Sequence, residues 1–301
     1  MAGSTPASAI ADATDVAPVG RVGALGRAPR RRLLRRILQT PAGAAGVSLT
    51  LLVIVVGLLA DLLAPTDPLV PAGPPLAPPS PAHLMGTDAL GRDLLSGVVY
   101  GARTSLVVVF ATGALVLLIG VTVGTVSGYR GGRVDDALMR VTEFFQVLPR
   151  FFLAIMAIAL FGPGLDLLVL VLGLTSWATL ARVVRAEVLS LSQREFVEAA
   201  RASGASDTRI VVLEILPNAL PAAVVYLGLL LAQVLLLEAS LGFLGLGDPN
   251  LVSWGYLAGQ AQRFLRVAWW LSFFPGVAIA FAVLGLNLLG DALTDVLGGR
   301  R

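Results

Sequence analysis

The chain has 301 residues, of which 56% are hydrophobic and 14% charged, and its formal net charge is +3. Soluble domains carry roughly a quarter charged residues, so this composition, with a mean hydropathy of +0.84, excludes an ordinary soluble protein and indicates a helical membrane protein. The apolar runs do not alternate with a period of two, which excludes a transmembrane β-barrel.

Residues 1–36 are rich in small residues and Pro and end in a cluster of arginines from Arg30 to Arg36. This composition predicts a flexible basic tail on the cytoplasmic side of the membrane. The apolar run that follows is too long for the core of a signal peptide and lacks a suitable cleavage site, so we expect it to remain as the first span. Residues 37–301 are expected to form a single transmembrane domain.

Six apolar runs are long enough to cross a hydrocarbon core of about 30 Å as helices. The predicted fold is therefore an all-α polytopic membrane protein with six transmembrane helices and both termini in the cytoplasm. The runs are Ala42–Leu63, Ser105–Ser127, Phe144–Gly162, Leu167–Val184, Leu220–Leu241 and Ala268–Leu289.

The arginines set the orientation of these spans. With the N-terminus inside, most arginines fall in the cytoplasm, as the positive-inside rule expects. The exceptions are Arg150, within the third run, and four arginines outside, namely Arg92, Arg103, Arg263 and Arg266.

Two outer segments follow from this topology, residues 64–104 and 243–267. The first half of segment 64–104 is dominated by Pro and is expected to be extended. The stretch Gly86–Ser96 predicts a turn that leads into an amphipathic helix. Although Asp88 and Asp93 superficially resemble a calcium loop, the alternating oxygen ligands and the terminal Glu of such a loop are missing.

Missing residue types exclude several kinds of site. All 22 basic residues are Arg, and a phosphate-binding loop needs Lys to reach the nucleotide phosphates. If nucleotide drives this protein, another polypeptide is expected to bind it. The absence of Cys excludes thiolate sites and disulfides. The single histidine, His83, lies in the Pro-rich loop, where we expect it to be solvated, and no metal-ligating cluster is apparent.

A polar insert at residues 185–217 separates the fourth and fifth runs on the cytoplasmic side. Good helix formers surround Glu198, Gly204 is suited to a left-handed position at the helix end, and Ser206 or Asp207 is suited to capping a second helix. Pro217 is expected to mark re-entry into the membrane. The prediction is a short helix pair across the membrane surface, either to dock on a partner or merely to cover the ends of the spans.

The spacing within this insert resembles the signature of bacterial ABC importer permeases. The matching residues are Glu198-Ala199-Ala200, Gly204 and Leu216-Pro217, with Glu214 departing from the usual aliphatic residue. Two further stretches are similar to the dipeptide/oligopeptide branch, whose close relatives include nickel transporters. Gly86–Asp93 with Tyr100–Leu106 resembles the segment before the second span of the C-type inner-membrane subunit. Glu238–Gly247 followed by Ser253-Trp254-Gly255 resembles the end of the fifth span and the outer loop after it.

This resemblance implies a type I ABC importer permease in a bacterial inner membrane, without catalysis of its own. Its implied partners are a homologous second permease, two ATPase subunits or domains, an extracytoplasmic binding protein and membrane lipid, with no nucleic acid. ATP and Mg²⁺ would be bound by the ATPase, and this chain would bind no cofactor or metal. The residues implied in ATPase coupling are Glu198, Ala199, Ala200, Gly204, Ala205, Asp207, Leu216 and Pro217.

Polar residues within spans are costly and suggest function. The candidates for the translocation path are Gln233, Glu238 and Asn287, with Asp291 and Arg150 as further possibilities. Arg150 stands where the family usually has a small neutral residue, and it could instead reach toward a membrane surface.

The candidates for docking of the binding protein lie in the two outer segments. They are Asp88, Arg92, Asp93 and Trp254, with Tyr256 beside them.

Three questions stay open at this level. The cargo could be di- or oligopeptides, or nickel, haem or another small solute. A secondary transporter would carry its own coupling carboxylates and often an internal repeat, but no obvious repeat is present, and the insert would be unexplained. An intramembrane enzyme would need a paired nucleophile and base or a metal cluster, and neither is apparent.

Overall fold

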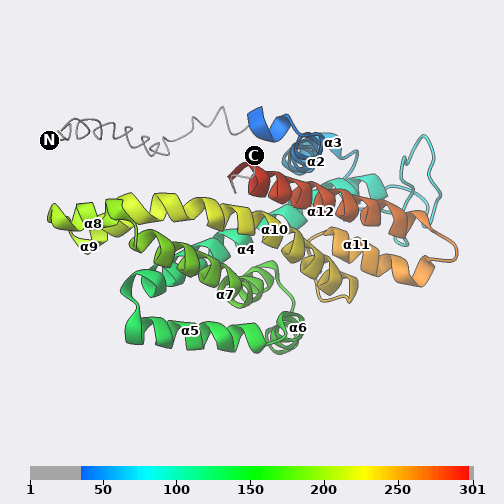
Figure 1. Ribbon diagram of the computed structural model, residues 1–301. Coiled ribbons are helices and arrows are strands. Elements are labelled where there is room, and N and C mark those ends of the chain that lie inside the picture. The colour runs from blue at the N-terminus through cyan, green and yellow to red at the C-terminus, as the bar shows by residue number, and fades with distance from the viewer. Residues whose placement is uncertain (1–34, 298–301) are drawn as a thin grey trace, which may run out of the picture.

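The structure is a computed structural model that describes residues 35–297. Every regular element in this part of the chain is a helix, which confirms the all-α prediction. The predicted basic tail lies almost wholly outside the described residues, as do residues 298–301. Figure 1 shows the long helices bundled together, with α8 and α9 at one end of the molecule and α11 at the other.

Five helices are each long and apolar enough to cross a membrane. Most begin or end several residues beyond the predicted runs, because their polar ends continue the helix. The first run is divided between a span and the short helix α3, Ala60–Leu63. The five spans are α2 (Pro41–Leu58), α4 (Leu94–Arg130), α7 (Leu165–Ser192), α10 (Leu216–Phe243) with its extension from Asp207, and α12 (Trp270–Leu297).

The third predicted span is not one helix. Its residues are divided between α5, Gly132–Val147, and α6, Arg150–Phe161, which meet at an angle of 78°. The cause is Pro149, because a proline disfavours helical backbone at the preceding residue. Leu148 accordingly takes an extended conformation with φ −73° and ψ 127°. The pair counts as a sixth span only as a broken one.

Close packing between α4 and α7 forms the centre of the bundle. Gly120, Gly124 and Gly128 recur every four residues along one face of α4, and each lies against α7. A Cβ atom at Gly124 would stand 2.5 Å from the carbonyl oxygen of Ala181. Small residues at this spacing let two membrane helices approach closely.

The outer end is closed by a cap of irregular chain and short helices. Helix α4 begins eleven residues before the predicted run, because the Asp93 side chain caps it by accepting a bond of 2.9 Å from Ser96 N–H. The cap also includes α11, Trp254–Ala261, and the 3₁₀ turn η2, Gln262–Phe264. Neither element was predicted within the second outer segment.

The expectation that His83 is merely solvated is wrong. Its Nδ1 lies 2.9 Å from Oδ1 of Asp93, and the His83 side chain is only 16% exposed. The extended loop folds back on the start of α4 and buries Asp93. The residues adjacent to His83 in the sequence do not indicate that its side chain meets Asp93.

Candidate functional site

Within the insert, helix α8, Glu195–Ala202, ends at a glycine in the left-handed conformation, as predicted. Gly204 has φ +78°, Gly204 N–H donates to the carbonyl of Arg201, and Ala205 N–H donates to the carbonyl of Ala200. This pair of bonds is the Schellman arrangement, in which a glycine reverses the chain and satisfies the last carbonyls of a helix. The chain therefore makes a defined turn at the tip of the molecule.

The second half of the insert differs from the expected separate helix. Ser206 occupies the N-cap position without a side-chain cap bond, and α9, Asp207–Ile210, continues through the π-helical turn η1, Val211–Ile215, into α10. Pro217 lies near the start of α10 and does not interrupt it. The wider turn is marked by the bond from Leu216 N–H to the carbonyl of Val211. The insert is therefore one short helix joined to a helix that runs on through the bundle.

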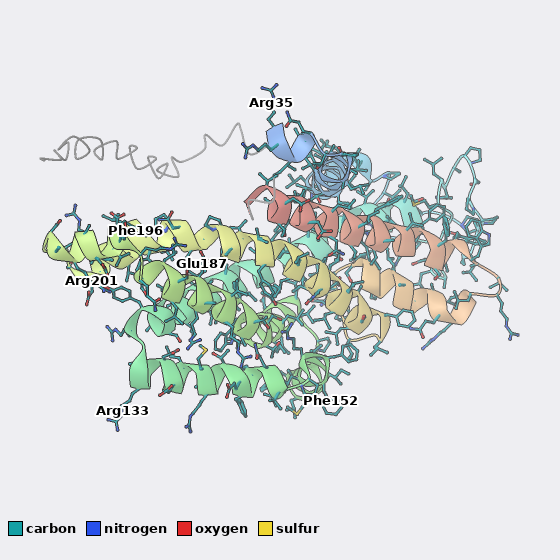
Figure 2. The ribbon with its side chains drawn as sticks, in the orientation of Figure 1. Arg35, Arg133, Phe152, Glu187, Phe196 and Arg201 are labelled. Carbon is teal, nitrogen blue, oxygen red and sulfur yellow. The ribbon has the colours of Figure 1, made fainter. Side chains whose placement is uncertain are left out.

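Buried apolar side chains fix the insert to the rest of the chain. Val197, Ile210 and Ile215 are fully buried, whereas Glu198 and Ala199 are exposed on the other side of α8. Figure 2 shows Phe196 and Arg201 at this same end of the molecule. The tip therefore presents both charged and small side chains to solvent, on a base that is anchored in the core.

Tyr129, near the end of α4, is a contact residue that the sequence did not reveal. Its hydroxyl donates a bond of 2.7 Å to Asp207, and the guanidinium of Arg201 lies 5.7 Å from the centre of its ring. One side chain from α4 thus holds both halves of the turn. The only sequence signal was an aromatic residue at the end of a span.

The predicted coupling residues are not all in one place. Ala200, Gly204 and Ala205 line an open groove of about 360 Å³, with Arg209 and Glu214 also along it. Glu198 and Ala199 lie on the exposed side of α8, and Asp207 is held by Tyr129. Leu216 and Pro217 stand apart, about 15 Å along the helix from Asp207 at 1.5 Å per residue.

A ladder of polar contacts joins α5 to α7. At its cytoplasmic end, Asp135 accepts bonds from Arg185 and from Ser127 of α4. Farther along the ladder, Nη2 of Arg182 lies 3.5 Å from Oε1 of Glu143.

The ladder ends at the break between α5 and α6. There the hydroxyl of Thr179 lies 3.5 Å from Gln146 Nε2 and 3.4 Å from Arg150 Nη2. Arg150 is the first residue of α6 and is half-buried.

The three predicted path residues occupy different environments. Glu238 is 3% exposed and accepts a bond of 3.1 Å from Ser105 of α4, a position that favours a structural role between α4 and α10. Gln233 is exposed on α10, and five residues of helix place it on a different face from Glu238. Asn287, on α12, is half-buried, and Asp291 is exposed.

The outer docking candidates also separate into two groups. Asp93 is buried against His83, and Trp254, 2% exposed, donates a bond of 2.8 Å to the carbonyl of Val98. Both side chains build the outer cap. Asp88 and Arg92 instead line a small surface pocket of about 40 Å³ together with Tyr256.

Comparisons with known proteins agree with this architecture. Residues 120–301 match the family described as binding-protein-dependent transport system inner membrane component. A putative peptide transport system permease protein of Brucella suis is 37% identical over 92% of this chain and 94% of its own length.

Two relatives from Bacillus subtilis are similarly close in identity. The dipeptide transport system permease protein DppC is 36% identical over 87% of this chain and 83% of its own. The oligopeptide transport system permease protein OppC is 38% identical over 73% of this chain and 72% of its own length.

Solved structures show the same fold. Two inward-facing crystal forms of the MetNI methionine ABC transporter superpose on 68% of this chain and 97% of their own, with 21% identity and TM-scores of 0.58 and 0.53. The bundle of spans, the anchored insert and the family match agree with one another. The chain therefore belongs to the family of binding-protein-dependent transport system inner membrane components and is an ABC importer permease.

Proposed function

We propose that this chain forms one half of a path for di- and oligopeptides and couples that path to a separate ATPase. The other half would be a homologous permease, and an extracytoplasmic binding protein would deliver the cargo. The peptide assignment is supported by the names of the relatives, which are 36–38% identical. ATP and Mg²⁺ would be bound by the ATPase, and this chain would be non-catalytic.

The observation that carries the coupling role is the continuity of the insert with the spans. The turn at Gly204 leads directly into the helix from Asp207 to Phe243, and Val197 and Ile210 fix its base in the core. Tyr129 links the same turn to α4. A displacement of the tip would therefore move α10 and α4 together, and coupling requires a rigid element of this kind.

The small surface pocket lined by the half-buried residues Asp88, Arg92 and Tyr256 supports a landing surface for the binding protein at the opposite end. Docking is assigned to these three residues rather than to the buried Asp93 and Trp254. The path itself would run between this chain and its partner permease.

The test is reconstitution of the chain with its genomic partner subunits in lipid vesicles. We expect the ATPase to co-purify with this chain and peptide uptake to require both ATP and the binding protein. Uptake that continues without the ATPase under an ion gradient would instead identify a secondary transporter. ATP-dependent uptake of another solute, with no peptide uptake, would refute the peptide assignment alone.

A further inference from the structure

We propose that the turn between α11 and α12, residues 262–269, is a membrane anchor that binds an anionic phospholipid in the outer leaflet. The turn combines two arginines with exposed apolar side chains, directly before a span begins. Figure 1 shows it at the end of the molecule opposite α8 and α9. The inference concerns the surface of this chain and does not depend on which cargo is carried.

The two arginines of the turn, Arg263 and Arg266, are exceptions to the positive-inside rule. They are the only charged residues in the stretch 249–290, and both are exposed. Among residues 35–297, no carboxylate lies within 4.0 Å of either guanidinium, whereas Arg103, another outer arginine, has an acidic partner. The charges of the turn are therefore available to an anion outside this chain.

Exposed apolar side chains alternate with buried ones through the second half of the turn. Leu265, Val267 and Trp269 are 54%, 66% and 56% exposed, whereas Ala268 and Trp270 beside them are buried. Large apolar surface that is left open in this way marks a contact with another protein or with a membrane.

The exposed face of α12 indicates that this contact is with the membrane. Helix α12 is one of the spans, and the ring centre of Trp269 lies 5.6 Å from that of Phe273 on its first turn. The turn is therefore continuous with the exposed face of this span. From residue 270 to residue 286, every exposed residue is apolar, namely Phe273, Gly276, Ala280, Phe281 and Leu284.

The combination of side chains is typical of a segment that lies in a membrane interface. Trp gathers at the level of the lipid headgroups, and interfacial segments place Leu or Trp toward the acyl chains and Arg toward the polar side. Leu265 and Val267 would enter the hydrocarbon, and the two guanidiniums would reach the phosphates. Arg can hold a phosphate through two parallel bonds. A headgroup without a cation of its own would not repel the arginines, which favours an anionic lipid.

Hydrogen bonds fix the turn to the rest of the outer end. Nε2 of Gln262 donates a bond of 2.6 Å to the carbonyl of Phe243 at the end of α10. Directly after the turn, Nε1 of Trp270 donates a bond of 3.2 Å to the carbonyl of Thr87 in the outer loop. A lipid bound to the turn would therefore hold both α10 and the outer cap at a fixed position relative to the membrane.

The tryptophans provide the test, because Trp269 is exposed and the other three, Trp177, Trp254 and Trp270, are buried. The complete importer is reconstituted with phosphatidylglycerol or phosphatidylcholine that carries bromine on its acyl chains, because bromine quenches the fluorescence of a nearby indole. The emission of Trp269 is the difference between wild type and Trp269→Phe. The emission of the buried control is the difference between wild type and Trp177→Phe.

We expect brominated phosphatidylglycerol to quench Trp269 strongly and Trp177 weakly. Mixed vesicles then measure the preference of the turn for phosphatidylglycerol over phosphatidylcholine. Replacing both arginines, Arg263→Gln with Arg266→Gln, should lower this preference about fivefold or more, and each single replacement should give an intermediate loss. The control Arg140→Gln, at an exposed arginine on α5, should keep the wild-type preference.

Three results would overturn the anchor. An emission of Trp269 that neither lipid quenches would show that protein, such as the partner permease, covers the turn. A preference for phosphatidylglycerol that survives the replacement of both arginines would remove them from the lipid site. Quenching that disappears when the binding protein is added would assign the surface to that protein. None of these results depends on whether the importer takes up peptides, so failure of the anchor is distinct from failure of the proposed function.

Discussion

Replacing Gly204 by valine is expected to abolish coupling to the ATPase while the chain still folds and inserts into the membrane. Gly204 closes the turn at the tip of the insert with φ +78°. No atom lies within 4 Å of the place where a Cβ would stand. The substitution therefore acts through backbone strain and not through a clash.

The size of this strain can be compared with what holds α8 in place. A left-handed L-residue costs about 1–2 kcal/mol, and a β-branched residue in such a conformation reaches about 3 kcal/mol. The main anchor of α8 is the buried Val197, and full burial of such a side chain stabilises by about 1.5–3 kcal/mol. Strain and anchor are thus of similar size, and 2 kcal/mol changes a local equilibrium roughly 30-fold.

The assay measures how much ATPase co-purifies with the chain and how fast ATP drives uptake in vesicles. Gly204→Val should lower uptake at least about tenfold, because the strain displaces most copies of the turn, and Gly204→Ala should have a smaller effect. Gly245→Val is the matched control. Gly245 has φ +80°, is equally open, and closes the same type of turn at the outer end of α10.

The control is expected to suffer similar strain and yet retain its ATPase. Wild-type uptake by the Gly204→Val complex would refute the coupling assignment. An equal loss of ATPase from Gly245→Val would show that general destabilisation, and not the position of the turn, causes the effect.

Three further substitutions test the surrounding structure. Tyr129→Phe removes the hydrogen bond to Asp207 of the insert but keeps the ring, and should weaken the attachment of the insert by about 1 kcal/mol. The measurement is stimulation of the ATPase by cargo-loaded binding protein, which should fall; unchanged stimulation would contradict this role of Tyr129. Gly124→Ala places its Cβ against the carbonyl of Ala181 and should destabilise by about 1–3 kcal/mol, seen as a lower Tm in detergent, whereas Gly276→Ala, in open space, should not lower it. Thr87→Val leaves the part-buried N–H of Ala77 and the carbonyl of Pro74 without their partner. It should cost about 1–3 kcal/mol, measured as faster proteolysis of the outer cap, and wild-type resistance to proteolysis would refute this role.

The fold class and the tip of the insert could be predicted because their causes are local. Long apolar runs dictate helices in lipid, and Gly204 is adapted to a left-handed turn whatever surrounds it. Pro149 was also visible in the sequence, but the apolar run across it was read as a single span. A proline disfavours helical backbone at the residue before it, here Leu148. This local rule predicts that the run is divided into two helices.

The contacts that shape the candidate sites are long-range, and periodicity does not report them. His83 and Asp93 meet because the extended loop folds back on α4. Tyr129 meets Asp207 because the end of α4 lies beside the start of α9. Neither pair shares a spacing that would mark it in the sequence.

By itself, the sequence determined a helical membrane protein with a left-handed turn at Gly204 in its cytoplasmic insert, since hydrophobicity and backbone preference act within a few residues. Only the tertiary structure decided which polar residues are enclosed and which remain available. Glu238 and Trp254 became part of the interior, whereas Arg150 was left at a broken span without an acidic partner among residues 35–297. Burial and pairing depend on which helices pack together, so one-dimensional patterns could not decide them.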